Sequence, residues 1–449
     1  MVKWFDDLNW RERNTVQACF AAWSCDGFDV QMFAFVMPAL LAAWHVTTTQ
    51  ASVMTTVALL GSALGGWICG ALADRFGRVR LLQATILWYA GFTFLCGFAQ
   101  DFQQLFLLRV LQGLGAGGVW AVATVLVGET VRDPSRGRAV GWVQAGWPLG
   151  WGAAAVLYLI ILAVLPEAIA WRVLFWFGLA PALLVLWVHN NLDEPDLSQL
   201  KGPGLGARLL APFRQPHGPI VWRVVLMTAG AQGSSYAILT YVPIYLRNVR
   251  HLAAVGTGAY LFALILGCFC GIAAGGYLAD RVGRKAPLLL SLFGSAILMP
   301  AAMLAPVSSQ IILPIGFVLG FVNQMMLAPM GTIMTELFPA AIRGGAQGFG
   351  YNAGRGIAAI VPALVGLLSA HTGFGGAIAI LGLVGFTLML TGLMLLPETR
   401  GRLVTGPGAG AQHQADDTQP GDAGDEARKS IDLWRRAQTR GRKNHHRQR

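Results

Sequence analysis

Long apolar runs, each of roughly 18–25 residues, recur along the whole chain and restrict its fold more than any other feature. A run of this length crosses the hydrocarbon core of a bilayer as one α-helix. A helix satisfies its own backbone hydrogen bonds, which lipid cannot do. Composition agrees, because 55% of the 449 residues are hydrophobic and only 12% are charged. The sequence therefore predicts an all-α membrane protein with twelve transmembrane helices.

The runs divide the chain into five segments. The predicted spans lie at about 15–39, 50–73, 80–99, 102–127, 138–164, 170–189, 221–246, 254–278, 286–305, 309–335, 345–369 and 375–396. We expect an interfacial N-terminus at 1–14, a six-helix half at 15–189, a linker at 190–220, a second six-helix half at 221–396 and a disordered tail at 397–449.

The positive charges sort onto one side of this topology. Of the 33 Lys and Arg residues, three (Arg172, Arg247 and Arg250) fall on the opposite side and two (Arg109 and Arg355) lie within spans. By the positive-inside rule, both termini are cytoplasmic. The net charge of +11 is thus explained by topology, and it does not indicate a nucleic-acid partner.

The sequence contains no pattern typical of an enzyme or a metal site. Its six cysteines all lie in apolar runs and pair with no histidine at zinc spacing, so we interpret them as small apolar residues. No nucleophile and base stand together in a recognisable motif. We therefore predict no catalytic residue, no metal and no cofactor.

Two motifs recur at nearly the same offset. Residues 70–78, Gly-Ala-Leu-Ala-Asp-Arg-Phe-Gly-Arg, return at 276–284 as Gly-Tyr-Leu-Ala-Asp-Arg-Val-Gly-Arg. Glu129 with Arg136 returns as Glu336 with Arg343. An internal repeat of six spans is the layout expected of a transporter whose site lies between its halves.

These loops resemble the signature of the major facilitator superfamily. Two further segments do too: residues 109–115, Arg-Val-Leu-Gln-Gly-Leu-Gly, and residues 397–401, Pro-Glu-Thr-Arg-Gly. The resemblance covers about residues 10–402 and implies alternating access between two halves, normally in a monomer. It also implies a latch of ion pairs that holds the inward gate shut; the alternative is that the arginines only keep these loops cytoplasmic. The predicted gating residues are Asp74, Arg75, Arg78, Glu129, Arg136, Asp280, Arg281, Arg284, Glu336 and Arg343.

Charged residues near the middle of a span are costly and need an explanation. Asp26 and Asp29 lie three residues apart in the first span, on one face of the helix. Two carboxylates close together in a low dielectric resist ionising together, which suits proton coupling. Arg355 lies deep in the eleventh span. Its guanidinium presents a fork of two parallel N–H donors that matches the two oxygens of a carboxylate. The alternative for both sites is a structural ion pair between the spans.

Other polar residues within the spans are candidates for binding a substrate. They are Arg109 in the fourth span, Gln232 and Tyr236 one turn apart in the seventh, and Asn352 close before Arg355. A structural ion pair for Arg109 and a polar stripe between helices for the seventh span are the alternatives.

Asp26-Gly27-Phe28-Asp29 resembles a sequence of the bacterial aromatic-acid/proton symporters, and the surroundings of Arg355 are similar to theirs and to those of the related sialate and lactate symporters. This resemblance implies proton-coupled uptake of a small organic acid, an aromatic or a hydroxy or sugar carboxylate, across the bacterial inner membrane. The proton gradient would supply the energy, and the organic anion, protons and the lipid bilayer would be the only partners. The alternative is a proton-driven exporter or a sugar porter of the same superfamily.

Overall fold

The computed structural model describes residues 3–44, 48–194, 204–248, 254–304 and 312–400. Its first part contains α1 (Lys3–Asp6), α2 (Trp10–Trp44), α3 (Thr48–Phe76), α4 (Arg78–Cys96), α5 (Phe102–Thr130), η1 (Asp133–Ser135), α6 (Arg136–Val164), α7 (Glu167–Phe177) and α8 (Pro181–Asn191). Its second part contains α9 (Leu205–Leu210), η3 (Ala211–Phe213), α10 (Gly218–Asn248), α11 (Ala254–Val282), α12 (Lys285–Leu304), α13 (Ile312–Gln324), α14 (Leu327–Leu337), α15 (Arg343–Ala358) and α16 (Val361–Met394). The described residues form no strand, which confirms the predicted all-α fold.

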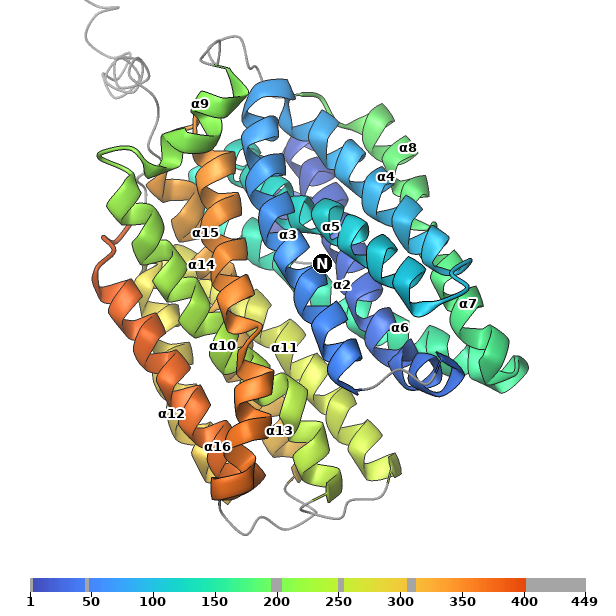
Figure 1. The fold of residues 1–449 in the computed structure, drawn as a ribbon. Helices are drawn as coiled ribbons and strands as arrows, with labels where there is room; N and C mark the ends of the chain where they lie inside the picture. The colour runs from blue at the N-terminus through green and yellow to red at the C-terminus, as the bar shows by residue number, and fades with distance from the viewer. Residues whose placement is uncertain (1–2, 45–47, 195–203, 249–253, 305–311, 401–449) are drawn as a thin grey trace, which may run out of the picture. The chain divides into compact units, whose positions relative to one another are not determined.

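The helices form two groups that follow the sequence repeat. Figure 1 shows α2–α8, coloured blue to green, on one side and α10–α16, coloured green to red, on the other. Helix α3 of the first half packs along α15 of the second, and α6 packs along α11. These two helix pairs make most of the contact between the halves, and α5 with α15 and α6 with α14 add to it.

Nine helical stretches among the described residues are long and apolar enough to cross a membrane. One of them, Arg343–Met394, is 52 residues long and covers two spans, because the backbone breaks at Gly373 with φ 70°. The other two predicted spans fall in α2 and α10, which have 35 and 31 residues. Asp26 and Asp29 lower the hydropathy of α2.

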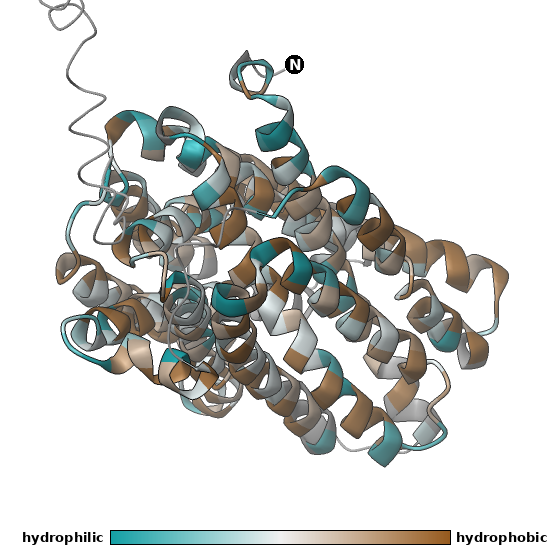
Figure 2. Ribbon diagram, turned by 90° about the horizontal axis from the view of Figure 1, so that it is seen from above, coloured by the Kyte–Doolittle hydropathy of each residue, from teal (hydrophilic) through white to brown (hydrophobic). Residues whose placement is uncertain are grey.

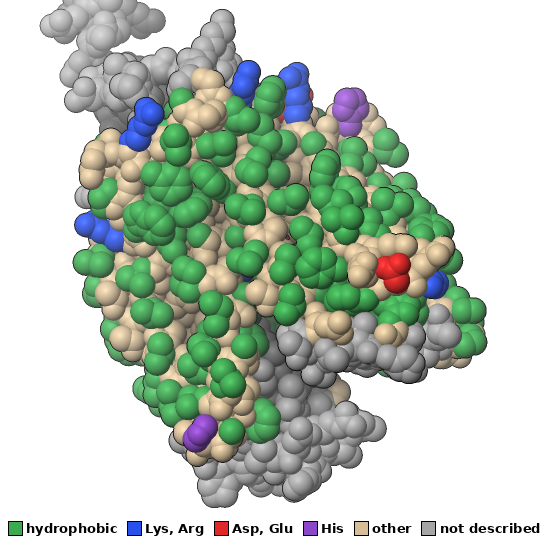
Figure 3. All heavy atoms as spheres, in the orientation of Figure 1, with side chains coloured by type: hydrophobic (Ala, Val, Ile, Leu, Met, Phe, Trp, Pro, Cys, Tyr) green, Lys and Arg blue, Asp and Glu red, His purple; other side chains and the backbone are tan. Residues whose placement is uncertain are grey.

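The outer surface is that of a protein embedded in lipid. In Figure 3 hydrophobic side chains cover most of the visible face, and most of the visible Lys and Arg side chains lie along one rim. Figure 2 shows apolar residues recurring along helices throughout the bundle. Leu159, Leu183 and Phe262 are 66–71% exposed, an arrangement that lipid tails stabilise and water would not.

Glycines bring the helix backbones of the two halves close together. A Cβ atom added at Gly70 of α3 would lie 2.1 Å from the carbonyl oxygen of Gly344 in α15. One added at Gly348 would lie 2.1 Å from the carbonyl oxygen of Gly66. Larger residues would force the helices apart, so these glycines permit the seal between the halves.

The N-terminal segment folds against the bundle. Trp4 and Leu8 are buried, and α2 starts at Trp10 after a reciprocal pair of hydrogen bonds between Asn9 and Glu12. The predicted linker contains α9 and η3, and Trp67 of α3 donates to the Leu209 carbonyl in α9. The predicted disordered tail lies, beyond residue 400, outside the described residues.

Candidate functional site

Asp29 is held by three side chains at the centre of the first half. Thr93 of α4 donates to its Oδ1 at 2.5 Å, and Gln112 of α5 donates to its Oδ2 at 2.5 Å. Arg109 Nη1 lies 3.6 Å from the same Oδ2, and its guanidinium lies 4.1 Å from the centre of the Phe33 ring. Each oxygen of the Asp29 carboxylate therefore accepts a hydrogen bond, and Arg109 is its counter-ion.

Arg355 lies in the second half with much of its donor capacity uncommitted. It is 8% exposed and sits about 18 Å along α15 from the start of the helix. Its Nε donates to the Tyr236 hydroxyl of α10 at 3.1 Å, the one hydrogen-bond partner that the described residues provide. One turn away Gln232 donates to the Tyr351 hydroxyl at 2.8 Å. Two terminal guanidinium nitrogens thus remain for the two oxygens of a carboxylate.

Asp26 is buried in α2, one helical turn before Asp29. Arg355 and Arg109 are the basic side chains whose charge acts on Asp26, and Arg109 is the one that acts on Asp29. No ion pair joins Asp26 to either arginine in the part of the chain that the structure describes. Asp26 is 1% exposed, and its Oδ2 has no hydrogen-bond partner. The two aspartates therefore share a helix face and have different environments.

An aromatic stack connects the halves beside this site. The rings of Trp120 in α5 and Tyr351 in α15 are stacked with centroids 3.5 Å apart. Trp120 Nε1 also donates to Gln144 of α6. Asn352 donates to the Gly117 carbonyl of α5 at 3.3 Å, so this predicted substrate-binding residue links the halves. Only Oδ1 of Asn352 is left without a partner.

The first predicted latch group joins the halves at one end of the bundle. It consists of Asp74, Arg78, Glu129 and Arg343. Arg78 Nη2 lies 3.0 Å from Asp74, and Arg78 Nε lies 3.0 Å from Glu129. Across the boundary, Arg343 Nη1 donates to Glu129 at 2.6 Å. The Asp74 carboxylate accepts hydrogen bonds from the backbone N–H groups of Gly344 and Gly345, in the first turn of α15. An anion is favoured at a helix N-terminus, so this contact is stabilising.

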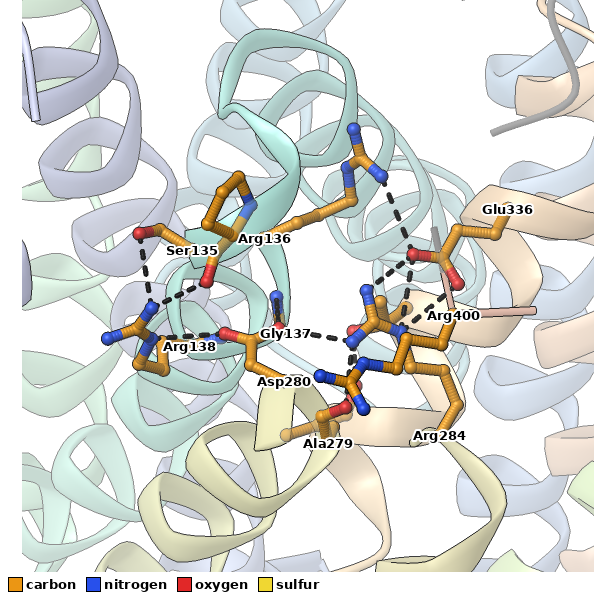
Figure 4. Close-up of polar contacts among 12 residues, drawn as sticks. Ser135, Arg136, Gly137, Arg138, Ala279, Asp280, Arg284, Glu336 and Arg400 are labelled. Atoms are coloured by element: carbon orange, nitrogen blue, oxygen red, sulfur yellow. Dashed lines mark hydrogen bonds and ion pairs between the residues drawn. The ribbon is translucent and has the colours of Figure 1, made fainter. Parts of the chain in front are cut away.

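The second latch group repeats this geometry with the halves exchanged (Figure 4). Arg284 pairs with Asp280 at 3.1 Å and with Glu336 at 2.7 Å. Arg136 reaches Glu336 from the first half at 3.5 Å. Asp280 accepts from the backbone N–H groups of Gly137 and Arg138 in the first turn of α6.

The partners within these groups differ from the simplest expectation. Glu129 pairs with Arg343 and Glu336 with Arg136, so each glutamate meets the arginine of the other half. Arg75 and Arg281 do not join either group. They are exposed, with their guanidinium groups over the rings of Phe76 and Tyr277.

Two carboxylates that support the latch groups were not recognised from the sequence. Glu194 accepts hydrogen bonds from the backbone N–H groups of Arg78, Val79 and Arg80 at the start of α4. Glu398 does the same for Arg284 and Lys285 at the start of α12. Burial raises the pKa of Glu398, but these and neighbouring backbone donors outweigh it and hold that pKa below its usual value. The available signal was a glutamate beside a proline shortly after the sixth and twelfth spans.

Thr93 and Trp120 lie in no recognised motif, and Gln112 lies in the 109–115 segment but was not predicted to contact Asp29. Thr93, Gln112 and Trp120 come from neighbouring helices, and only the packing of α2, α4, α5 and α15 brings them to the aspartates and to Tyr351.

Comparison with known proteins decides the family. The model of the Major Facilitator Superfamily matches residues 19–308 and 265–441. The chain belongs to the major facilitator superfamily. The chain is 38% identical over 417 residues to a protein of Cupriavidus pinatubonensis named "Probable 4-methylmuconolactone transporter". The alignment covers 92% of this chain and 97% of that protein.

Two further proteins are similar to this major facilitator protein. It is 30% identical over 378 residues to the cis,cis-muconate transport protein of Acinetobacter baylyi, covering 82% of this chain and 90% of that one. Among solved structures, the proton:xylose symporter XylE bound to 6-bromo-6-deoxy-D-glucose superposes with a TM-score of 0.73 at 17% identity, covering 88% of this chain and 97% of that chain. The chain is therefore an integral membrane transporter and not an enzyme.

Proposed function

We propose that this transporter takes up a small organic acid together with protons across the bacterial inner membrane. The observation that carries the proposal is Arg355, a nearly buried guanidinium bonded through its Nε to Tyr236, in a protein that also buries Asp26 with an unpaired Oδ2. A fixed guanidinium recognises a carboxylate, and a buried carboxylate can carry a proton. A neutral substrate such as a sugar would not need the free fork of Arg355.

The names of the relatives support an organic acid. Muconate is a conjugated dicarboxylate, and a muconolactone is an unsaturated lactone that keeps one carboxylate, so both names are those of organic acids. Tyr236 contacts Arg355, and one turn away on the same two helices Gln232 bonds to Tyr351, which stacks on Trp120. A flat, conjugated acid suits these surroundings.

The latch groups support alternating access. By the distribution of Lys and Arg, they lie on the cytoplasmic side, where both are closed in this conformation. Inward release requires that Asp74 leaves α15, that Asp280 leaves α6, and that Trp120 separates from Tyr351. The binding energy of the substrate and the proton would have to favour this second state.

Uptake into proteoliposomes tests the proposal. A panel of labelled aromatic, unsaturated, hydroxy and sugar acids is offered with and without an inwardly directed proton gradient. We expect gradient-dependent accumulation of at least one acid, loss of uptake in Arg355→Ala, and poor recovery in Arg355→Lys, which keeps the charge and removes the fork. Arg80→Ala is the control, because that exposed side chain lies outside the site. Flux of sugars or drugs without uptake of any acid would contradict the proposal.

A further inference from the structure

Asp26 and Asp29 differ in how their charge is compensated. Both Asp29 oxygens accept short hydrogen bonds, and Arg109 stands beside them. Asp26 Oδ2 is buried and accepts none. A buried carboxylate oxygen without a donor is unfavourable when ionised, whereas one with donors and a cation is stable in that form.

The charged and titratable groups around Asp26 come from several helices. They are Arg355 and Tyr351 of α15, Arg109 of α5, Tyr89 of α4, and Cys25 and Asp29 on α2 itself. Helix α6, which packs along α2, carries no acidic or basic side chain between 139 and 157. Arg355 and Arg109 are therefore the cations that can compensate the charge of Asp26. Arg109 is already paired with Asp29, and Arg355 is the one that binds the substrate in the proposed function.

Resting on that proposed function, we propose that Asp26 is the proton carrier and that Asp29 stays ionised as the fixed counter-ion of Arg109. From the outer side, Asp26 carboxylate takes up one proton and becomes a neutral carboxylic acid. Arg355 then pairs with the carboxylate of the substrate instead. On the inner side the substrate leaves, and Asp26 returns its proton to the cytoplasm.

Counting charge explains why the two movements are coupled. Empty, the pair of Asp26 and Arg355 is neutral. With proton and monovalent acid both bound, it is neutral again. A proton alone leaves one buried positive charge, and the acid alone leaves one negative charge. Enclosing an uncompensated charge is costly, so only the empty and the doubly loaded forms change conformation readily. Uptake of a monocarboxylate is then one proton per molecule and electrically neutral.

Asp29 is unsuited to the same role. Protonating it would leave Arg109 without a counter-charge and would disturb the hydrogen bonds from Thr93 and Gln112. Arg109 Nε and Nη1 already lack hydrogen-bond partners, so its charge depends on Asp29. Removing one partner of a buried ion pair is strongly destabilising.

Net uptake and substrate exchange, measured in variants of Asp26 and Asp29, distinguish the roles of the two aspartates. Asp26→Asn is permanently neutral, so its loaded form is uncharged and its empty form is positive. We expect this variant to lose net, gradient-driven uptake down to the level of protein-free liposomes. It should still exchange internal for external substrate, with an exchange rate independent of pH. Asp29→Asn should lose both net uptake and exchange, and Asp26→Glu should retain coupled uptake.

The outcomes distinguish the inference from the proposed function. If wild-type protein shows no gradient-driven uptake of any acid, the proposed function fails. If wild type shows it and Asp26→Asn retains it, or if Asp29→Asn is the variant that only exchanges, the assignment of the proton to Asp26 is wrong. Substrate-induced thermal stabilisation gives a second readout, which should depend on pH in wild type and not in Asp26→Asn. Acceleration of monocarboxylate uptake by an inside-negative potential would overturn the count of one proton.

Discussion

Tyr236 determines how Arg355 presents its fork. Its hydroxyl accepts from Arg355 Nε at 3.1 Å, which leaves the two terminal nitrogens free. Tyr236→Phe keeps the ring and removes this acceptor, so a nearly buried donor loses its partner at a cost of about 1–3 kcal/mol. We expect substrate affinity to fall by about tenfold, measured as the KM for uptake. Tyr277→Phe is the control, since Tyr277 is 41% exposed and remote from the site. An unchanged KM in Tyr236→Phe would show that the hydroxyl does not orient Arg355.

Glu12 joins the N-terminal segment to the loop before α6. It accepts from the Arg132 backbone and side chain. Burial raises the pKa of Glu12, but the hydrogen bonds from Arg132 and Asn9 outweigh this effect and the net pKa is lowered. A carboxyl group whose pKa is lowered by folding stabilises the folded state at pH values above its unfolded-state pKa. This contribution is lost as the pH falls through the folded-state pKa.

We therefore expect Glu12→Gln to lower the melting temperature at pH 7. The difference from wild type should shrink as the pH falls below about 4. Asp193→Asn is the control, because its ion pair with Arg11 has both side chains more than 60% exposed and should contribute little. A melting difference that is the same at every pH would mean that the charge of Glu12 is not what stabilises the segment.

Helices α4 and α12 start at equivalent turns that require glycine. Gly77 has φ 109° and Gly283 has φ 102°, in the left-handed region that costs an L-residue roughly 1–2 kcal/mol. At Gly77 an added Cβ would also lie 2.4 Å from the carboxyl carbon of Glu194, whereas at Gly283 the nearest Glu398 atom is 3.1 Å away. Gly77→Ala should therefore destabilise the protein more than Gly283→Ala, measured by thermal unfolding in detergent.

The control is in the same helix. Gly91 of α4 has open space where its Cβ would lie, and alanine is the better helix former. Gly91→Ala should leave the melting temperature unchanged or raise it. If Gly77→Ala left the melting temperature as Gly91→Ala does, Glu194 could move aside without loss of stability. A glycine at this positive φ would then not be required.

The sequence predicts most of the helices and the helix ends that carry the latch groups. The apolar runs indicate the helices, and the repeated Asp-Arg-x-Gly-Arg segments indicate which helix ends carry the latch groups. The break at Gly373 lies in the loop predicted between the last two spans. The breaks between α13 and α14 and between α15 and α16 fall inside predicted spans, and the pattern does not show them because the segments stay apolar. Of the partners of Asp29, Arg109 was a candidate for an ion pair, whereas Thr93 and Gln112 could not be predicted, because they are ordinary helix residues until α4 and α5 pack against α2.

Across the whole molecule, the repeat creates an ambiguity that only the packing of the halves resolves. Each half supplies a glutamate and an arginine at the same spacing, so pairing within a half and pairing between halves fit the sequence equally well. Glycines at the boundary bring α3 against α15 and α6 against α11, and this close contact puts Arg343 on Glu129 and Arg136 on Glu336. Each latch group therefore holds the halves together, and neither can open without a change in the other half.

A double-mutant cycle tests this pairing. Glu129→Gln and Arg343→Gln remove two partners 2.6 Å apart, so their effects on the free energy of unfolding in mixed micelles should be non-additive by about 1 kcal/mol or more. The matched cycle of Glu129→Gln with Arg136→Gln uses the same glutamate and the arginine of its own half. That cycle should be closer to additive, because Arg136 is directed to Glu336. Larger coupling of Glu129 to Arg136 than to Arg343 would mean that the latch groups pair within each half. The halves would then be joined at this end mainly by the backbone contacts of Asp74 with α15 and Asp280 with α6, and loss of these two aspartates would open it.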